Sequence, residues 1–341
     1  MPAHRIGILG CGARGRAFAA AVAACDAAEL IICVDDDLAD AQAVAGEFGG
    51  QAVANWADQA LNTLIMTIPR VDAATLQAAT QAGIHVLVDP PLARGVVEAR
   101  RMARAAERRP ARVGVAFEWR FQPLVRLLRA VVPRPRFAHL VTAVDAGPPQ
   151  APMSVRDTVW TTPHHALDLL MHLLGGAPAE IVADGGPLPR PTQGPATVVV
   201  PPRADALVAE LYFDRERHAA LTAAGGGADP ELGSVVLDLT DGTTRIRVWS
   251  DWTAAEILAL DGRSLDPPRL PGLRLAREGR AWMARAEHDG QALADLVLAF
   301  ADGAPGGESV PGAADGARAV ALTRAVLAGA ASGRTQTLRA A

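Results

Sequence analysis

Residues 5–15 read Arg-Ile-Gly-Ile-Leu-Gly-Cys-Gly-Ala-Arg-Gly, and this stretch decides the fold. A short apolar run over residues 5–10 predicts a strand, and the alanine-rich residues 13–24 predict a helix directly after it. The glycines at 10, 12 and 15 form a GxGxxG pattern, which is informative because it lies between a strand and a helix. There the first glycine permits a tight turn, the second admits a diphosphate to the backbone, and the third lets helix and strand pack closely.

The next strand of the pattern adds a carboxylate to this predicted diphosphate site. Asp35 ends the apolar residues 29–34 and follows Gly15 by 20 positions. A carboxylate there accepts hydrogen bonds from the ribose hydroxyls and repels a 2′-phosphate, which favours NAD over NADP. The residues themselves thus predict a cofactor site made of Gly10, Gly12, Ala13, Arg14, Gly15 and Asp35. A glycine turn that binds no nucleotide is the alternative.

Apolar strands continue to alternate with helices beyond this unit. We expect helices over residues 39–48, 72–82 and 96–107, and strands over residues 63–67, 85–88 and 112–116. Strands without a polar face, separated by helices, are typical of a parallel sheet covered on both sides. The sequence therefore predicts an α/β chain with a doubly wound parallel Rossmann domain over residues 1–122.

From about residue 136 the strands show more alternation and shorter links, and Asp241-Gly242 is a hairpin signal. This pattern predicts a C-terminal α+β domain over residues 123–341 with an open, mainly antiparallel sheet, and a Pro- and Gly-rich loop over residues 184–203. The strands expected are 137–144, 196–200, 206–213, 218–223, 235–239 and 245–248, and the helices expected are 163–174, 291–301 and 312–331.

Composition excludes several classes of protein. The chain of 341 residues has a formal net charge of −4 and no dense basic block, so we expect no nucleic-acid partner. Its apolar runs are of strand length, and no leader-like segment precedes the first strand, so we expect no membrane partner and a cytoplasmic location. The three cysteines, Cys11, Cys25 and Cys33, form no CxxC pair, so neither a disulfide framework nor a zinc site is expected.

The chain contains no lysine, and all 33 of its basic residues are arginine. Arginine stays protonated in proteins, whereas lysine can give and take a proton near neutral pH. A mechanism that needs a lysine ammonium group is therefore excluded throughout the chain.

Five segments resemble the Gfo/Idh/MocA oxidoreductase family, whose usual chemistry is hydride transfer between NAD(P) and a ring hydroxyl of a sugar or cyclitol. The resemblance adds Thr67, Pro69 and Asp89 to the expected cofactor site, and it implies a homo-oligomer formed through the C-terminal sheet. The segments are Thr67-Ile68-Pro69, Ala82–Ala93 (AGIHVLVDPPLA), Val115–Pro123, His165-Ala166-Leu167-Asp168 with the following Leu173-Leu174-Gly175, and Ala331–Leu338.

This sequence departs from the family pattern at the positions that carry the family's catalytic residues. The lysine of the family's EKP motif falls on Pro90, its glutamate becomes Asp89, and the aspartate before the helix histidine falls on Thr161. We expect Pro90, Trp119 and Thr161 to line the substrate pocket. The alternatives are a rigid turn at Pro90, where an X–Pro bond is readily cis, and a place in the interdomain core for Trp119.

Imidazole is the best proton-transfer group that remains, because its pKa lies near neutrality. His165 is the first catalytic candidate, with His164 and Asp168 beside it, and a capping or packing role is the alternative for each histidine. Asp168 is expected to orient His165 or to anchor the helix. His165, Asp168 and His172 share a helix face, but we expect no metal site because the outer pair lies two turns apart.

Two classes of function follow from these residues. The first is an NAD-dependent oxidoreductase with non-standard catalytic residues, acting on a sugar, cyclitol or related small polar metabolite. The second is a catalytically lapsed or redox-neutral NAD-binding protein, such as a sensor, a partner subunit, or a catalyst of NAD-assisted elimination or epimerisation. Binding of small molecules is expected in both.

Overall fold

The computed structural model describes residues 4–67, 72–144, 155–186, 206–225, 235–287, 291–302 and 309–338. The chain forms two compact units: Met1–Gln122 with Gly290–Ala321, and Pro123–Asp289 with Leu322–Ala341. The sequence predicts residues 123–341 as one uninterrupted second domain, whereas Gly290–Ala321 lies in the first unit. No local sequence feature assigns Gly290–Ala321 to the first unit, because that assignment depends on contacts with residues far away in the chain.

The first unit is built on a six-stranded sheet in the order β3-β2-β1-β4-β5-β6, and every pairing in it is parallel. The predicted doubly wound parallel sheet is therefore confirmed. Because all strands run the same way, their carboxyl ends share one edge, where ligands of such sheets bind. The strands are β1 (His4–Leu9), β2 (Ala28–Val34), β3 (Gln51–Ala52), β4 (Thr63–Met66), β5 (His85–Val88) and β6 (Val113–Val115).

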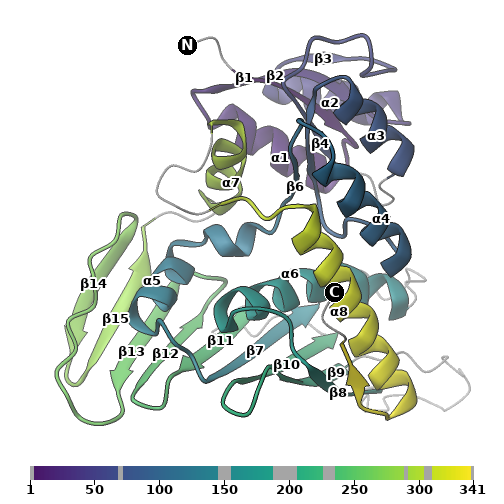
Figure 1. The fold of residues 1–341 in the computed structure, drawn as a ribbon. Helices are drawn as coiled ribbons and strands as arrows, with labels where there is room; N and C mark the ends of the chain where they lie inside the picture. Colours follow the sequence, from purple (N-terminus) through teal and green to yellow (C-terminus); the bar gives the residue numbers. More distant parts are fainter. Residues whose placement is uncertain are drawn as a thin grey trace, which may run out of the picture. The chain divides into compact units, whose positions relative to one another are not determined.

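Helices cover both faces of this sheet (Figure 1). Helices α1, α2 and α7 share a buried apolar core on one face, and α3 and α4 pack on the other. Asp37 and Asp72 cap α2 and α3 by accepting hydrogen bonds from backbone N–H groups of the first turn. The elements are α1 (Ala13–Ala23), α2 (Leu38–Phe48), α3 (Ala73–Gln81), α4 (Val96–Glu107), the 3₁₀ turn η1 (Glu118–Phe121) and α7 (Gln291–Asp302).

Helix α7 completes the core of the first unit, although it follows β6 by more than 170 residues. The ring of Phe300 is buried and fills the space over Gly114, where a Cβ atom would lie only 2.7 Å from Phe300 Cε2. Arg112 secures the end of the helix, because its Nη2 donates to the carbonyl of Phe300 at 2.7 Å. The same guanidinium lies over the Phe300 ring, 5.2 Å from its centroid.

The second unit contains a ten-stranded sheet in the order β14-β15-β13-β12-β11-β7-β10-β9-β8-β16. Its pairings are antiparallel except for β7 with β10, which confirms the expected mainly antiparallel sheet. The strands are β7 (Phe137–Val144), β8 (Glu180–Gly186), β9 (Ala206–Tyr212), β10 (His218–Gly225), β11 (Val235–Thr240), β12 (Thr244–Trp249), β13 (Ala254–Ala259), β14 (Leu273–Glu278), β15 (Ala281–Ala286) and β16 (Gln336–Thr337).

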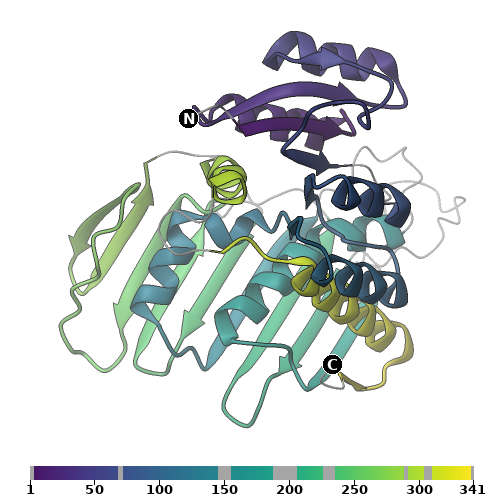
Figure 2. The ribbon, with the colours of Figure 1, turned by 45° about the horizontal axis from the view of Figure 1, so that its top comes forward.

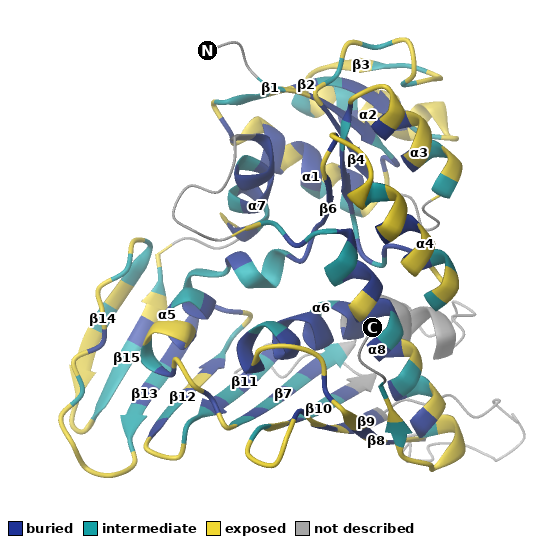
Figure 3. Ribbon diagram, in the orientation of Figure 1, coloured by how far each residue is buried: buried dark blue, intermediate teal, exposed yellow. Residues whose placement is uncertain are grey.

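Some predictions for this unit need correction. Residues 184–186, expected in a loop, belong to β8, while residues 187–203 and the strand expected at 196–200 lie outside the described residues. Strands β13 to β16 were not predicted at all. The edge strand β14 is mostly exposed, yellow in Figure 3, and its charged residues Arg274, Arg277 and Glu278 blunt an otherwise free sheet edge.

One face of the large sheet carries helices α5 (Pro123–Val131) and α6 (Val155–Leu174), as Figure 2 shows. Helix α5 packs on the sheet because four of its leucine and valine residues, at 124, 125, 127 and 128, are buried on one side. Helix α6 contains Pro163, and its second half is almost entirely buried. Helix α8 (Ala313–Ser332) contributes residues to both units. No helix among the described residues is both long and apolar enough to cross a membrane.

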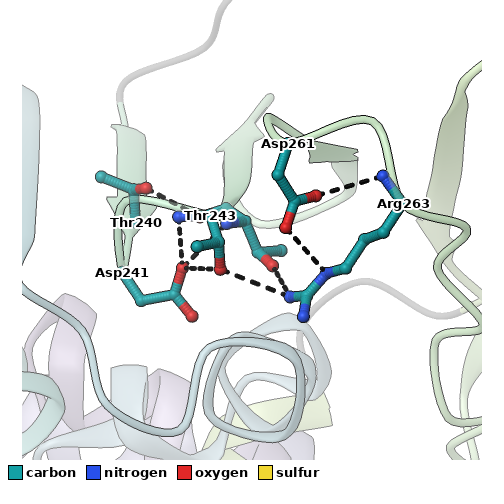
Figure 4. A network of polar contacts seen from close by, with 6 residues as sticks. Thr240, Asp241, Thr243, Asp261 and Arg263 are labelled. Atoms are coloured by element: carbon teal, nitrogen blue, oxygen red, sulfur yellow. Dashed lines mark hydrogen bonds and ion pairs between the residues drawn. The ribbon is translucent and has the colours of Figure 1, made fainter.

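The predicted hairpin at Asp241-Gly242 joins β11 to β12 and is held by a polar network (Figure 4). Asp241 Oδ1 accepts hydrogen bonds from the backbone N–H groups of Thr243 and Thr244, each at 2.8 Å. Arg263 supports the turn from the following loop, because its Nη2 donates to Thr244 Oγ1 at 2.6 Å. Burial alone would raise the pKa of Asp241, but these hydrogen bonds outweigh burial and lower it.

Candidate functional site

The glycine loop after β1 has the geometry that the sequence predicts. Gly10 adopts φ +98°, a conformation that favours glycine, at the start of the turn. A Cβ atom on Gly15 would lie 2.0 Å from the carbonyl oxygen of Gly10, so α1 approaches the loop as closely as glycine allows. Thr67, which follows β4, donates from Oγ1 to the same carbonyl at 2.6 Å. Thr67 therefore fixes the glycine loop that is predicted to bind the cofactor.

Gly12 is the N-cap of α1, and Ala13 is the exposed first residue of that helix. Among the described residues, no heavy atom lies within 4 Å of the place that a Cβ atom of Gly12 would occupy. No side-chain hydrogen bond caps the first turn of α1 among the described residues, whereas Asp37 and Asp72 cap the corresponding turns of α2 and α3. An uncapped helix N-terminus with open space over Gly12 fits a diphosphate. The diphosphate would accept hydrogen bonds from the N–H groups of the first turn, and the helix dipole would stabilise its negative charge.

Asp35 lies at the carboxyl end of β2 and is connected directly to the glycine loop. Its Oδ2 accepts a hydrogen bond from the backbone N–H of Cys11 at 2.5 Å, and its Oδ1 accepts one from Asp37 at 2.9 Å. The carboxylate is thus held in place, and each oxygen retains a lone pair for a ribose hydroxyl. Cys11 is buried in the loop and packs, as its small size predicts.

Arg14, the fifth residue of the glycine motif, forms ion pairs with two carboxylates. Its Nη2 and Nε lie 2.7 and 3.0 Å from Asp89 Oδ1, and its Nη1 lies 3.2 Å from Glu118 Oε1. The ring of Phe18, one turn along α1, lies beneath the guanidinium at 5.3 Å. Burial opposes the charge of Arg14, but Glu118 and Asp89 outweigh it and raise the pKa of the guanidinium. Arg14 therefore remains a cation.

Glu118 is a site residue that the sequence did not single out as one. It lies in η1, just beyond β6, while Asp89 directly follows β5. Two carboxylates after neighbouring parallel strands share the carboxyl edge of the sheet. The sequence could therefore have predicted that Asp89 and Glu118 lie near each other. It could not have predicted their shared partner, because Arg14 lies in a helix more than 70 residues earlier.

The remaining predicted site residues are distributed as follows. Pro90 is buried in the first unit and is joined to Pro91 by a cis peptide bond. Trp119 is partly buried in η1. Thr161 lies in α6, where the structure describes the backbone alone, and Pro69 lies outside the described residues.

The two adjacent histidines of α6 differ in their surroundings within the second unit. His164 is completely buried, and its Nδ1 is hydrogen-bonded to Thr323 Oγ1 of α8 at 3.0 Å. Burial, with smaller effects of His165 and Arg324, lowers the pKa of His164 to about 3. His165 is only partly buried, and Asp168 one turn later is buried. This environment favours a packing role for His164, which stays neutral at physiological pH.

The burial of His164 predicts how the free energy of unfolding depends on pH. Its pKa in the folded state lies below the ordinary value of 6.5, so the unfolded chain binds more protons between pH 6.5 and about 3. Stability should therefore fall as the pH is lowered through this window, with a slope from this group of at most about 1.4 kcal/mol per pH unit. Urea unfolding of the wild type and of His164→Asn at several pH values measures it. The variant should show the flatter profile, and parallel profiles would contradict the prediction.

Within the part of the chain that the structure describes, no three His, Cys, Asp or Glu side chains are grouped so that they could hold a metal ion. The row of His165, Asp168 and His172 on α6 is therefore not such a group.

Comparison with known proteins agrees with this geometry. Residues 4–117 match the family model GFO_IDH_MocA, described as an oxidoreductase family with an NAD-binding Rossmann fold. No curated protein matches the chain.

Several solved structures share the fold over nearly the whole chain. UDP-N-acetylglucosamine 3-dehydrogenase from Acidithiobacillus ferrooxidans is 21% identical, with a TM-score of 0.75, and the match covers 96% of this chain and 98% of that one. An oxidoreductase from Agrobacterium radiobacter, solved with NAD+, L-tartaric acid and magnesium, is 17% identical, with a TM-score of 0.76 and 98% of each chain covered. Levoglucosan dehydrogenase, solved with NADH and L-sorbose, is 18% identical, with a TM-score of 0.77 and 100% of each chain covered.

Proposed function

We propose that this chain, whose residues 4–117 match the NAD-binding Rossmann fold of the Gfo/Idh/MocA oxidoreductase family, oxidises or reduces a sugar, cyclitol or related small polar metabolite with NAD. One observation carries the proposal: Gly10, Gly12, Gly15, Thr67 and Asp35 form a connected cradle at the carboxyl edge of the sheet. The sugar-directed names of two structural neighbours, UDP-N-acetylglucosamine 3-dehydrogenase and levoglucosan dehydrogenase, support the substrate class.

The proposal includes a preference for NAD over NADP. Asp35 is fixed by the N–H of Cys11, so its carboxylate cannot easily turn away from the ribose position. A 2′-phosphate placed there would meet a negative charge and would lose the hydrogen bonds that a 2′-hydroxyl donates. Asp36 follows directly and adds a second negative charge.

We assign proton transfer to His165. The chain has no lysine, so a group other than an ammonium has to exchange a proton with the substrate oxygen while hydride moves to or from the nicotinamide C4. Of the two adjacent histidines of α6, the partly buried His165 is the better candidate, because His164 is completely buried and its Nδ1 is engaged with Thr323. Asp168, buried one turn later, is proposed to help to position this helix end.

The catalytic proposal predicts a large loss of turnover for His165→Ala. Removal of a general acid–base group typically costs about 10²- to 10⁴-fold in rate. The measurement is the rate of change of NADH absorbance with a panel of sugars, cyclitols and their keto forms. His139→Ala is the matched control, because His139 is a partly buried histidine of β7 in the same unit. Full turnover by His165→Ala would remove His165 from the mechanism.

A second function is favoured by the absence of lysine and by the buried Pro90 at the position of the family's lysine. In that case the protein binds NAD without net turnover, as a sensor or partner subunit, or as a catalyst of an NAD-assisted elimination or epimerisation. Stoichiometric NAD that keeps its redox state with every substrate of the panel would support this alternative. Sustained NADH production would eliminate it.

The proposal also includes a homo-oligomer formed through the large sheet of the second unit. Val182 of β8 and Val208 and Tyr212 of β9 are exposed by 44%, 46% and 37%. These three side chains alternate with buried residues along neighbouring strands, so they lie on the face opposite the core. In the strand register each of them lies opposite a carboxylate residue (Glu210, Asp184 and Glu180, respectively), so the surface that we propose for the contact is of mixed apolar and acidic character.

A further inference from the structure

Helices α3 and α4 lie side by side on one face of the first sheet (Figure 1), and a hollow of about 480 Å³ lies between them. The side chains of Leu76 and Met102, which are both buried, make the floor of the hollow apolar. Its rim carries three exposed arginines, Arg101, Arg108 and Arg109. Among the described residues that line the hollow, none is Asp or Glu. The hollow thus combines an apolar floor with a cationic rim.

The spacing of two of these arginines fits a ligand with several anionic groups. Arg101 and Arg108, the C-cap residue of α4, are seven positions apart, so they lie on one side of the helix about 10 Å apart along its axis. Gln77, exposed on α3, adds an amide to the opposite side of the hollow. A guanidinium group binds a phosphate through two parallel N–H groups. Two of them at this distance can bind two phosphate groups of one molecule.

The rest of the described chain does not engage these guanidinium groups. No hydrogen bond or ion pair joins the side chain of Arg101, Arg108 or Arg109 to another described residue, whereas Arg14 and Arg16 of α1 both pair with carboxylates. Residues 68–71, which directly precede α3 in the sequence and lie outside the described residues, contain no carboxylate. An anion that enters the hollow therefore displaces no ion pair of the described residues when it binds these arginines.

We propose that the hollow between α3 and α4 binds a small metabolite that carries two or more phosphate groups and an apolar part. The phosphate groups bind Arg101 and Arg108, and the apolar part lies on Leu76 and Met102. This site is separate from the glycine loop, because α3 and α4 pack on the face of the sheet opposite to α1. The inference depends neither on the proposed coenzyme nor on the proposed reaction.

The test is calorimetric titration of the full-length protein with inorganic triphosphate and with ATP, both without magnesium. One molecule of either probe should bind per chain, and ATP should bind more tightly because its base can reach the apolar floor. Arg101→Met and Arg108→Met should each weaken the binding of triphosphate about fivefold, the effect of losing one exposed ion pair. The double variant should weaken it about 25-fold, since effects at well-separated positions add.

Two kinds of control locate the site. Arg100→Met and Arg104→Met remove the same charge from the same helix, but Arg100 and Arg104 are exposed residues that do not line the hollow. Their affinity for triphosphate should stay within twofold of the wild type. Gly12→Ala alters the coenzyme loop alone, so it should bind triphosphate as the wild type does. Citrate, which carries a similar charge on carboxylates, should bind more weakly than triphosphate.

The inference is overturned if neither triphosphate nor ATP binds, or if Arg101→Met and Arg108→Met bind triphosphate as the wild type does. Equal losses in all four arginine variants would show a general attraction of α4 for anions and would also overturn it. Loss of triphosphate binding in Gly12→Ala would place the anion on the glycine loop instead. Citrate binding as tight as that of triphosphate would refute the preference for phosphate. A wild type that binds triphosphate in the hollow but does not bind NAD would support the inference and contradict the proposed function.

Discussion

Gly12→Ala is expected to weaken NAD binding on the order of 100-fold while the protein folds as before. The added methyl group meets no heavy atom of the described residues within 4 Å, and the backbone of Gly12, at φ −67° and ψ −163°, is accessible to alanine. The same methyl group would project into the space that the diphosphate needs. Calorimetric titration with NAD measures the affinity, and a thermal melt without coenzyme should show an unchanged Tm.

The paired variant Gly15→Ala should behave differently, because its methyl group would lie 2.0 Å from the carbonyl oxygen of Gly10. That contact forces α1 away from the loop, so both stability and NAD binding should be lost. If Gly12→Ala bound NAD as tightly as the wild type, the diphosphate would not rest on these amides. A lowered Tm for Gly12→Ala alone would show that the space over Gly12 is occupied by the protein.

Phe300→Ala is expected to destabilise the first unit by about 3–5 kcal/mol, the usual cost of removing a buried aromatic side chain. The ring is 4% exposed, fills the space over Gly114 and lies under the guanidinium of Arg112. All three groups belong to the first unit, although α7 follows the rest of that unit by a long stretch of chain. Urea unfolding monitored by circular dichroism measures the loss.

Val97→Ala provides the control for this prediction. Val97 is a large apolar residue of α4 in the same unit, but it is 84% exposed, so its truncation should change stability by less than about 0.5 kcal/mol. A loss below about 1 kcal/mol for Phe300→Ala would mean that α7 contributes little to the core, contrary to its buried face.

The Rossmann unit could be read from the sequence because its signals are local. The apolar strands are buried on both faces, so residues 85–88 stand out as an uninterrupted run, and helix α4 has the predicted bounds Val96–Glu107. The sheet of the second unit was harder to predict. Strand β14, Leu-Arg-Leu-Ala-Arg-Glu, is an exposed edge strand and lacks the apolar content by which a strand is recognised.

Helix α7 was predicted as a helix with nearly the right bounds, but its place in the first unit was not. Its apolar periodicity shows that one face is buried, yet nothing in residues 291–302 specifies which sheet buries it. That choice is made by partners such as Arg112 and Gly114, which lie more than 170 positions earlier.

The candidate site divides in the same way. The glycine loop and Asp35 follow from spacing, because their chemistry is carried by backbone turns and by the end of one strand. The pairing of Arg14 with Glu118 joins α1 to η1, and no spacing rule connects those positions. His164 and His165 differ because only one of these adjacent side chains is completely buried in the core. The hydrogen bond to Thr323 of α8 identifies His164 as that one.

The discontinuous first unit has a consequence for the growing polypeptide. When residue 122 leaves the ribosome, the sheet has all six strands, but the face that α7 covers still exposes apolar residues such as Phe18 and Phe121. Residues 123–290 have to be synthesised first, which takes on the order of 10–30 s at about 5–20 residues per second. Throughout that interval the nascent chain exposes the apolar face of the sheet that α7 later covers. We expect ribosome-associated chaperones to bind this face until α7 is synthesised.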